Sequence, residues 1–597
     1  MNPVVKAQMA EYAHSNAIND LPISAQFEIY SIFATLNGFL GESVDAYDVH
    51  LAGEEFGVDG IAILVQGELV KNKVEAAEKL SNIKNPTVEF IFFQSKTSTS
   101  YDYGDISKFF DAIEGFFDGN LRDESEVIAE LCCAKDEIYQ VGVGRRNPKI
   151  SAFYIATGNY DEPKRIESLR NGFVKTLEDL NIFDPNGISI NIVGAKQIQQ
   201  WYRAATTAVD VEIEFPKAVV MPSSTHVDEA YIGYLSAAQL IKLFTIRDET
   251  GAVVGVNKSV FFDNIRDYDP KSKINNEIKA SVKADAGQDF VFRNNGVTVV
   301  SKNIDRTADR FKLEDYQIVN GCQTSNIIFD MLHGPEQATY AHLNLESVIA
   351  VPFRLIGSKD DDFVSSIIVG TNKQNSVKEE QFWALRPFMK NFEEYARSVN
   401  EEEVIYFERR ENQYRGQPVE RVRIIQASIM MKALAAAILY QPHRAARDYR
   451  GISAEYDKKL FLDDHDVRIY HAACFLYYRL EFLWRNQKID SKHKTFRFYI
   501  LCAVGLLVTR GQPVFNMKKT KIEKVARQII ELSKDEKALK AVVSKTYQVI
   551  ERRLANMGIE SQEKIRDTIR SESFSTEFRE QILKQHIPSA DRYVVSQ

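Results

Sequence analysis

Residues 88–96 read Val-Glu-Phe-Ile-Phe-Phe-Gln-Ser-Lys, and residues 58–65 read Val-Asp-Gly-Ile-Ala-Ile-Leu-Val. Both runs are short and almost wholly apolar, which favours strands in the interior of a sheet. Polar residues stand at one end of each run: Asp59 in the first, Gln94 and Lys96 in the second. Because side chains alternate along a strand, Gln94 and Lys96 share one face. A hairpin or short crossover between the runs would place Asp59 beside them.

Further helices and strands surround these two runs. Apolar residues recur at helical spacing in some stretches, and short apolar runs indicate strands in others. The expected helices are 22–40, 105–117 and about 163–181, and the expected strands are 150–156 and 188–193. This order predicts an α/β unit with a mixed sheet over residues 1–205.

The chain is too long for a single core. At ~150 residues per domain, its 597 residues predict three or four units. Residues 206–228 contain Pro216 and Pro222 with several Ser and Thr residues, so we expect a linker there. Residues 229–455 alternate short strands and helices, which predicts an α+β region. Residues 456–597 are expected to be mostly helical, with long charged helices.

The composition is that of an ordinary soluble protein, with 44% hydrophobic and 26% charged residues. No apolar run reaches the ~18–20 residues of a membrane helix, and no signal-peptide pattern follows Met1. The five cysteines form no CxxC pair, which argues against a zinc ribbon or a disulfide framework. We therefore expect a cytoplasmic protein with reduced thiols and no membrane partner.

Charge is divided unevenly along the chain. Residues 1–200 contain 17 Lys and Arg against 30 Asp and Glu, a net charge of −13. Subtraction from the totals of 75 and 83 leaves 58 basic and 53 acidic residues in 201–597, a net charge of +5. Phosphate contacts are therefore expected mainly from the second region, whereas the acidic first region suits a cation site.

One carboxylate, one amide and one ammonium at a strand end form a set that phosphodiester hydrolysis can use. Mg²⁺ or Mn²⁺ takes oxygen ligands, which Asp59, the Gln94 amide and the Ser95 carbonyl would supply. Such a cation neutralises phosphate charge and acidifies a bound water. Lys96 would orient the attacking water and stabilise charge on the phosphate. Glu28, on the first predicted helix, would reach the same cation through a bound water.

Residues 1–205 resemble the PD-(D/E)xK nuclease fold, in the Mrr-like restriction endonuclease branch whose motif is written Asp…Gln-x-Lys. The motif falls on Asp59, Gln94 and Lys96, and the helical glutamate of the family falls on Glu28. The resemblance implies a restriction-endonuclease-like mixed sheet with these four residues as its catalytic set. The commoner pattern has an acid in place of Gln94, so the metal site here carries one negative charge fewer.

Three separated polar segments distinguish the second region. They are Asn294-Asn295-Gly296-Val297-Thr298, Asn320-Gly321-Cys322-Gln323-Thr324 and Thr371-Asn372. In this order they resemble the AIPR family, named for abortive-infection phage resistance, over residues 230–520 or so. The resemblance implies a bacterial anti-phage protein and assigns no reaction to this region.

Amides and hydroxyls near a helix N-terminus, with arginines nearby, suit the recognition of phosphates and base edges. The candidate nucleic-acid contacts are Arg293, Asn294, Asn295, Asn320, Gln323, Arg409 and Arg410. A purely structural role is equally open, because buried Asn and Gln side chains often satisfy turns and loop backbones.

Together these patterns predict an anti-phage nuclease that hydrolyses DNA with Mg²⁺ or Mn²⁺. Its expected partners are DNA, a phage-derived trigger and a second copy of the chain, bound through the C-terminal helices. One alternative is a catalytically inactive nucleic-acid-binding sensor or regulatory module of a defence system. RNA cleavage is a second enzymatic alternative.

Overall fold

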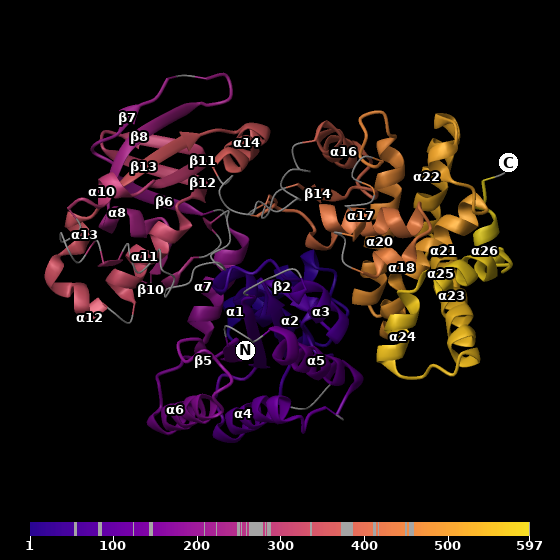
Figure 1. The fold of residues 1–597 in the computed structure, drawn as a ribbon, viewed down its shortest axis with the longest axis horizontal. Helices are drawn as coiled ribbons and strands as arrows, with labels where there is room; N and C mark the ends of the chain where they lie inside the picture. Colours follow the sequence, from indigo (N-terminus) through magenta and orange to yellow (C-terminus); the bar gives the residue numbers. More distant parts are fainter. Residues whose placement is uncertain are drawn as a thin grey trace.

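The computed structural model of the chain contains three units, seen in Figure 1 as an indigo-to-violet N-terminal domain, a magenta sheet region and an orange-to-yellow helical domain. The structure describes residues 1–52, 57–81, 86–122, 124–142, 147–207, 209–222, 224–247, 251, 253–257, 260–261, 279–280, 282, 288–334, 337–371, 386–409, 413–415, 417–447, 451–452, 456 and 459–595.

The N-terminal domain contains a five-stranded mixed sheet. Its strands lie in the order β2 (Glu68–Val70), β1 (Gly60–Val65), β3 (Val88–Lys96), β4 (Lys149–Ala156) and β5 (Ile188–Val193). Strand β1 is antiparallel to β2 and β3, whereas β3, β4 and β5 are parallel. The two apolar runs are therefore neighbouring strands, and the predicted α/β class with a mixed sheet is confirmed.

Helices cover both faces of this sheet because β3 is apolar on both sides. Phe90 and Phe92 belong to one core, and Ile91 and Phe93 belong to the core on the opposite face. The helices on the first side are α3 (Lys73–Leu80), α4 (Tyr103–Asp118), α5 (Glu126–Glu137) and α6 (Lys164–Asp179). Those on the second are α1 (Pro3–Ser15), α2 (Ile23–Phe33) and α7 (Ala195–Thr206).

The helix expected over residues 22–40 changes its geometry halfway. Helix α2 ends at Phe33 and continues as a π-helical turn, η1 (Ala34–Phe39). Gly38 in this turn packs on the backbone of α7, where an added Cβ would stand 1.9 Å from the carbonyl oxygen of Trp201. Glycine is therefore required for the close approach of η1 to α7.

The second unit is built on a six-stranded sheet. Its strands lie in the order β6 (Asp210–Glu214), β12 (Arg310–Asn320), β11 (Val297–Thr307), β13 (Ala350–Gly357), β8 (Glu229–Ser236) and β7 (Val219–Val220). Strands β9 (Thr245–Arg247) and β10 (Val253–Val256) form a separate pair. The described helices are α8 (Ala237–Lys242), α10 (Phe290–Arg293), α11 (Cys322–His333), α12 (Gln337–Tyr340), α13 (Leu345–Val348) and α14 (Asp361–Thr371).

The stretch expected as a linker, residues 206–228, contributes strands to this second sheet. Residues 210–214 pair with β12 along one edge, and Val219 and Val220 pair with β8 along the other. Pro216 and Pro222 flank β7, which is exposed at the sheet edge. Edge strands tolerate nearby prolines, so the proline content of residues 206–228 could not distinguish a linker from a strand at the edge of a sheet.

The C-terminal domain is helical and begins before residue 456. Helix α16 (Pro387–Ser398) shares one apolar core with helices that follow it as far as Val595. Strands β14 (Tyr406–Glu408) and β15 (Ile424–Gln426) form a short parallel pair in the same domain. The further described helices are α17 (Ala427–Ala437), α18 (Pro442–Ala445), α20 (Val467–Arg485), α21 (Arg497–Thr509), α22 (Lys519–Lys534), α23 (Glu536–Asn556), α24 (Gln562–Ile569), α25 (Glu572–Leu583) and α26 (Pro588–Asp591).

One segment among the described residues, Ser491–Asn516, is long and apolar enough to cross a membrane. It contains α21, and 67% of its most apolar window is buried inside the protein. Helix α21 packs against α17, α23 and α25. A helix that is apolar all round is expected at the centre of a large helical domain, and α21 lies there.

Ion pairs join the N-terminal domain to the C-terminal domain. Among the described residues, acidic side chains on the first meet basic side chains on the second in four pairs: Asp45 with Arg485, Asp48 with Lys494, Glu130 with Arg566 and Glu75 with Arg570. The uneven division of charge along the sequence thus has a structural counterpart, in which the acidic domain docks on a basic surface of the same chain.

Candidate active site

The register between β1 and β3 brings Asp59 and Gln94 together. Gly60 pairs with Phe93, so Asp59 stands opposite Gln94, and the Asp59 N–H donates to the Phe93 carbonyl at 2.8 Å. The Gln94 Nε2 donates to Asp59 Oδ2 at 3.0 Å, and the Ser95 N–H donates to the same oxygen at 2.5 Å. The carboxylate and amide expected to converge at the strand end are therefore in direct contact.

Lys96 is the last residue of β3 and is half-buried. Strand alternation puts it on the same face as Gln94, and its ammonium is close enough to lower the pKa of Asp59. No hydrogen bond or ion pair fixes this ammonium within the described part of the chain. Lys96 thus places a positive charge near the Asp59 carboxylate.

Glu28 approaches the same place from α2, which packs against β3. Its Oε2 lies 2.6 Å from Nε2 of His50, and the two side chains are 20% and 4% exposed. His50 forms a bridge with Gly60, the residue after Asp59. The sequence reasoning missed His50, which lies nine residues before Asp59 and has no ligand-like spacing to another histidine.

Burial and a second carboxylate nearby change the pKa of Asp59. Burial, and next the carboxylate of Glu28, raise its pKa to about 7, and the Ser95 N–H, the Lys96 ammonium and the Gln94 amide oppose this rise. Two acids placed close together in a partly buried site bind a proton or a cation more readily than isolated acids. The site therefore favours positive charge between Asp59 and Glu28.

Gln94, its chain neighbour Ser95 and its strand partner Tyr154 each carry a buried polar atom without a hydrogen-bond partner among the described residues. These atoms are Gln94 Oε1, Ser95 Oγ and the Tyr154 hydroxyl oxygen. Tyr154 pairs with Gln94 in the register between β3 and β4. Buried acceptors are normally satisfied, and Gln94 Oε1 is an oxygen of the kind that could ligate a hard cation. A turn of the amide about its terminal bond would bring Oε1 toward Asp59.

These oxygen groups fit a hard divalent cation better than zinc. Among the described residues, no group of three or more His, Cys, Asp and Glu side chains gathers to hold a metal. The oxygens of Asp59, the Gln94 amide and the Ser95 carbonyl could hold Mg²⁺ or Mn²⁺, with Glu28 in reach through water.

The first two AIPR-like segments lie against each other. Asn294 accepts from the Gly296 N–H at 2.7 Å, and its amide donates to Thr324 Oγ1 at 3.0 Å. Gly296 and Gly321 have φ values of +80° and +99°, and a Cβ on Gly321 would stand 2.7 Å from the Gly296 carbonyl oxygen. Both positions therefore require glycine, and Asn294 acts within this turn.

The remaining nucleic-acid candidates are dispersed. Asn295 and Gln323 are exposed, Arg293 pairs with Asp289 on the surface, and Asn320 is half-buried at the end of β12. Arg410 and Asn372 lie outside the described residues.

Arg409 lies far from solvent, in a network of ion pairs. Its side chain is 6% exposed, and it contacts Glu393 at 2.5 Å and Asp362 at 2.8 Å. Gln413 donates to the same Glu393 and accepts from the Arg409 N–H. This network joins α14 to α16 and leaves the guanidinium no open side for a phosphate.

The fold and the Asp59 cluster define a class: a multi-domain α/β protein whose N-terminal mixed sheet carries a carboxylate–amide–lysine site at a strand end.

Comparison with known families adds one finding. The family model described as AIPR protein matches residues 261–557, which span part of the second sheet and most of the helical domain. The match confirms the predicted resemblance to the AIPR family for this part of the chain. No curated protein and no solved structure matches the chain.

Proposed function

We propose that the chain is an anti-phage defence nuclease that hydrolyses phosphodiester bonds of DNA with Mg²⁺ or Mn²⁺. One observation carries the proposal: Asp59, with a pKa raised to about 7, contacts Gln94, whose buried amide oxygen has no partner in the described structure. The match of residues 261–557 to the AIPR family supports the defence role. It does not by itself indicate a nuclease.

The roles of the residues follow from their positions. Asp59, Gln94 and Ser95 would hold the cation with a carboxylate, an amide and a main-chain oxygen. A cation bound there neutralises phosphate charge and acidifies water. Lys96 would hold the scissile phosphate and orient the attacking water. In the reaction the water oxygen would form a bond to phosphorus and the bond to the leaving oxygen would break. One proton of the water would end on the leaving oxygen, which departs as a hydroxyl group, and the other would ionise from the new phosphate monoester.

Glu28 and His50 would act together at the edge of the site. The 2.6 Å contact fixes the Glu28 carboxylate, and His50 is almost completely enclosed. We assign His50 a positioning role, because its Nε2 contacts Glu28 rather than the space beside Asp59. Glu28 would then accept a hydrogen bond from a water on the cation and raise the negative charge of the site.

The decisive experiment incubates supercoiled plasmid with the purified full chain and Mg²⁺ or Mn²⁺, with EDTA as the metal-free control. The wild type is compared with Asp59→Ala and Lys96→Ala. Matched controls are Asp179→Ala and Lys175→Ala, which remove the same charges from the exposed face of α6. We expect nicked and linear DNA from the wild type and both controls only.

Equal residual activity in all five proteins would overturn the assignment of the site and favour the catalytically inactive sensor. Parallel incubation with RNA separates the two substrate classes. Titration with Mn²⁺, followed by calorimetry, gives a readout independent of cleavage, and we expect the heat of binding to disappear in Asp59→Ala.

A further inference from the structure

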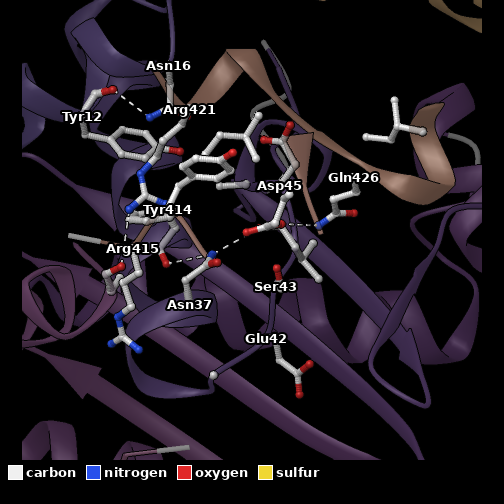
Figure 2. Close-up of a pocket in the computed structure, with 18 of the residues that line it drawn as sticks. Tyr12, Asn16, Asn37, Glu42, Ser43, Asp45, Tyr414, Arg415, Arg421 and Gln426 are labelled. Atoms are coloured by element: carbon white, nitrogen blue, oxygen red, sulfur yellow. Dashed lines mark hydrogen bonds between the residues drawn. The ribbon is translucent and has the colours of Figure 1, made fainter. Parts of the chain in front are cut away.

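The helical domain contacts the N-terminal domain at a short turn that precedes the candidate active site in the chain. The turn contains the 3-10 helix η2 (Ala46–Asp48), which Asp45 caps by accepting from the Tyr47 N–H at 3.1 Å. Asp45 also lines a cavity of about 230 Å³ between the two domains, and Figure 2 shows it there with Gln426 of the helical domain. Residues 45–48 are therefore part of the domain interface.

Two ion pairs fix this turn to the helical domain. Asp45 pairs with Arg485 at the end of α20, and Asp48 pairs at 2.8 Å with Lys494 in the 3-10 helix η8 (Ser491–Phe496). Burial by itself would raise the pKa of Asp48, but the ammoniums beside it, Lys494 foremost, lower this pKa well below its ordinary value. The Asp48 carboxylate is therefore ionised at neutral pH, as the pair requires.

Tyr47, between the two acids, contacts the same partners. Its ring centre lies 4.7 Å from the Lys494 ammonium and 5.2 Å from the Arg485 guanidinium. Its hydroxyl donates to the Trp484 carbonyl at 3.4 Å. Cations are attracted to the face of an aromatic ring, so three consecutive contacts with one domain determine where the turn lies.

Main-chain hydrogen bonds join the residues after this turn to Asp59. The Leu51 N–H donates to the Asp59 carbonyl at 2.9 Å. The Ile61 N–H donates to the Val49 carbonyl at 3.3 Å. The residues on both sides of Gly60 are thus bonded to the chain that leaves the turn, and a shift of residues 49–51 would move the main chain of Asp59.

The same segment carries His50, the partner of Glu28. The His50 Nε2 lies 2.6 Å from Glu28 Oε2. Helix η2 packs against α2, the helix that carries Glu28. Both acids of the candidate site, Asp59 and Glu28, are therefore supported by residues 45–51.

We propose that the helical domain positions the candidate active site through residues 45–51, with Arg485 and Lys494 as positioning residues. Their ion pairs fix the turn, and the turn fixes the main chain of Asp59 and the contact of His50 with Glu28. Both basic residues act through this segment rather than on the reacting atoms. The effect on cleavage rests on the proposed nuclease function, whereas the support of the Asp59 main chain does not.

The test compares Asp45→Asn with Asp490→Asn in the full chain. Asparagine keeps the acceptor that caps η2 and removes the charge that pairs with Arg485. Asp490 is a matched control, because it caps η8 by accepting from the Lys492 N–H and pairs with Lys492 inside the helical domain. Each variant loses one charge and one ion pair and keeps its cap, and the first loses a contact between domains.

Hydrogen exchange is measured at residues 45–51 and 59–61. We expect these amides to exchange about tenfold faster in Asp45→Asn than in the wild type and at the wild-type rate in Asp490→Asn. Lys494→Met breaks the second pair from the helical domain and should have the same effect, whereas Lys494→Arg, which keeps the charge, should restore the wild-type rate. Unchanged exchange in Asp45→Asn and Lys494→Met would overturn the proposal. Faster exchange spread equally over the N-terminal domain would also overturn it, since that indicates a general loss of stability.

Plasmid cleavage separates the positioning role from the nuclease function. Asp45→Asn should lower kcat about tenfold and leave KM within about twofold of the wild type, because the groups that contact DNA remain. Faster exchange at residues 45–51 with an unchanged kcat would overturn the positioning role. If the wild type does not cleave DNA, the nuclease proposal fails by itself, and the exchange rates still decide whether the helical domain supports Asp59.

Discussion

Asp59 and Arg409 are both charged residues away from bulk water, and their surroundings differ sharply. Arg409 is matched by Glu393 and Asp362, and Gln413 satisfies the rest of its network. Asp59 has a like charge in Glu28 as a neighbour, and the amide beside it keeps an oxygen without a partner in the described structure. Burying a polar group without a partner disfavours folding. The cluster around Asp59 is therefore the one at which we propose that a cation binds.

The largest expected effect is on DNA cleavage, which should depend on the cluster around Asp59 and not on the AIPR-like segments. Asp59→Ala or Lys96→Ala should reduce plasmid cleavage by roughly 10²–10³-fold, the usual effect of losing a group that stabilises transition-state charge. Thr324→Val, in the AIPR region, should leave the cleavage rate within about threefold of the wild type, since its hydroxyl serves a turn. A comparable loss in Thr324→Val would show that the second region contributes directly to the chemistry.

The second effect concerns stability in the helical domain. Arg409→Met removes one member of a buried ion-pair network and leaves Glu393 without its main partner, which should lower the free energy of unfolding by about 3 kcal/mol. Urea denaturation followed by tryptophan fluorescence measures it, with Arg527→Met as the exposed control. If both variants unfold alike, the Arg409 network is not a structural one, and its role in phosphate binding returns to consideration.

The third effect is a pH dependence in the metal-free protein. The folded-state pKa of Asp59, about 7, lies above its ordinary value of 3.8, so ionisation costs stability as the pH rises from about 4 to 7. Asp59→Asn removes that penalty. We expect it to be more stable than the wild type by about 1–2 kcal/mol above pH 7, with no difference near pH 4.

Thermal unfolding at several pH values in EDTA checks this expectation. The same proton competes with a cation, so Mn²⁺ affinity should fall as the pH is lowered below about 7. A pH-independent difference between the two proteins would show that Asp59 does not titrate with a raised pKa.

The smallest effect tests the turn formed by the AIPR-like segments. Thr324→Val removes the hydroxyl that pairs with Asn294 and should lower the free energy of unfolding by about 1 kcal/mol. Asn295→Ala, at the exposed neighbouring position, should change it by less than about 0.5 kcal/mol. Equal effects would indicate that the turn gains nothing from the Asn294–Thr324 contact.

The strand pair of the N-terminal domain was predictable because its signal is local. Apolar runs with polar ends fix both the strands and the face of Gln94 and Lys96, and the observed register then sets Asp59 opposite Gln94. The contact between Glu28 and His50 was not predictable in this way. It depends on how α2 packs across the sheet, and no short-range pattern in the sequence encodes that distance.

Domain boundaries were harder to predict from the sequence, for a related reason. Residues 210–214 add to the sheet edge through main-chain hydrogen bonds with β12, which leave little trace in side-chain pattern. The burial of Arg409 depends on partners 16 and 47 residues away. A run of arginines in a sequence indicates a phosphate-binding surface. The sequence alone does not tell whether those arginines are exposed or buried.

The ion pairs between the first and last domains affect whether the N-terminal domain can be studied as a separate fragment. A fragment ending near residue 207 would release Asp45, Asp48, Glu75 and Glu130 from their basic partners. It would do so in the part of the chain that already has 30 acidic and 17 basic residues in its first 200. Mutual repulsion would then weaken the fragment at low salt, and added salt should partly restore it. Single substitutions in the intact chain, rather than excised domains, are therefore the sound way to assign its activities.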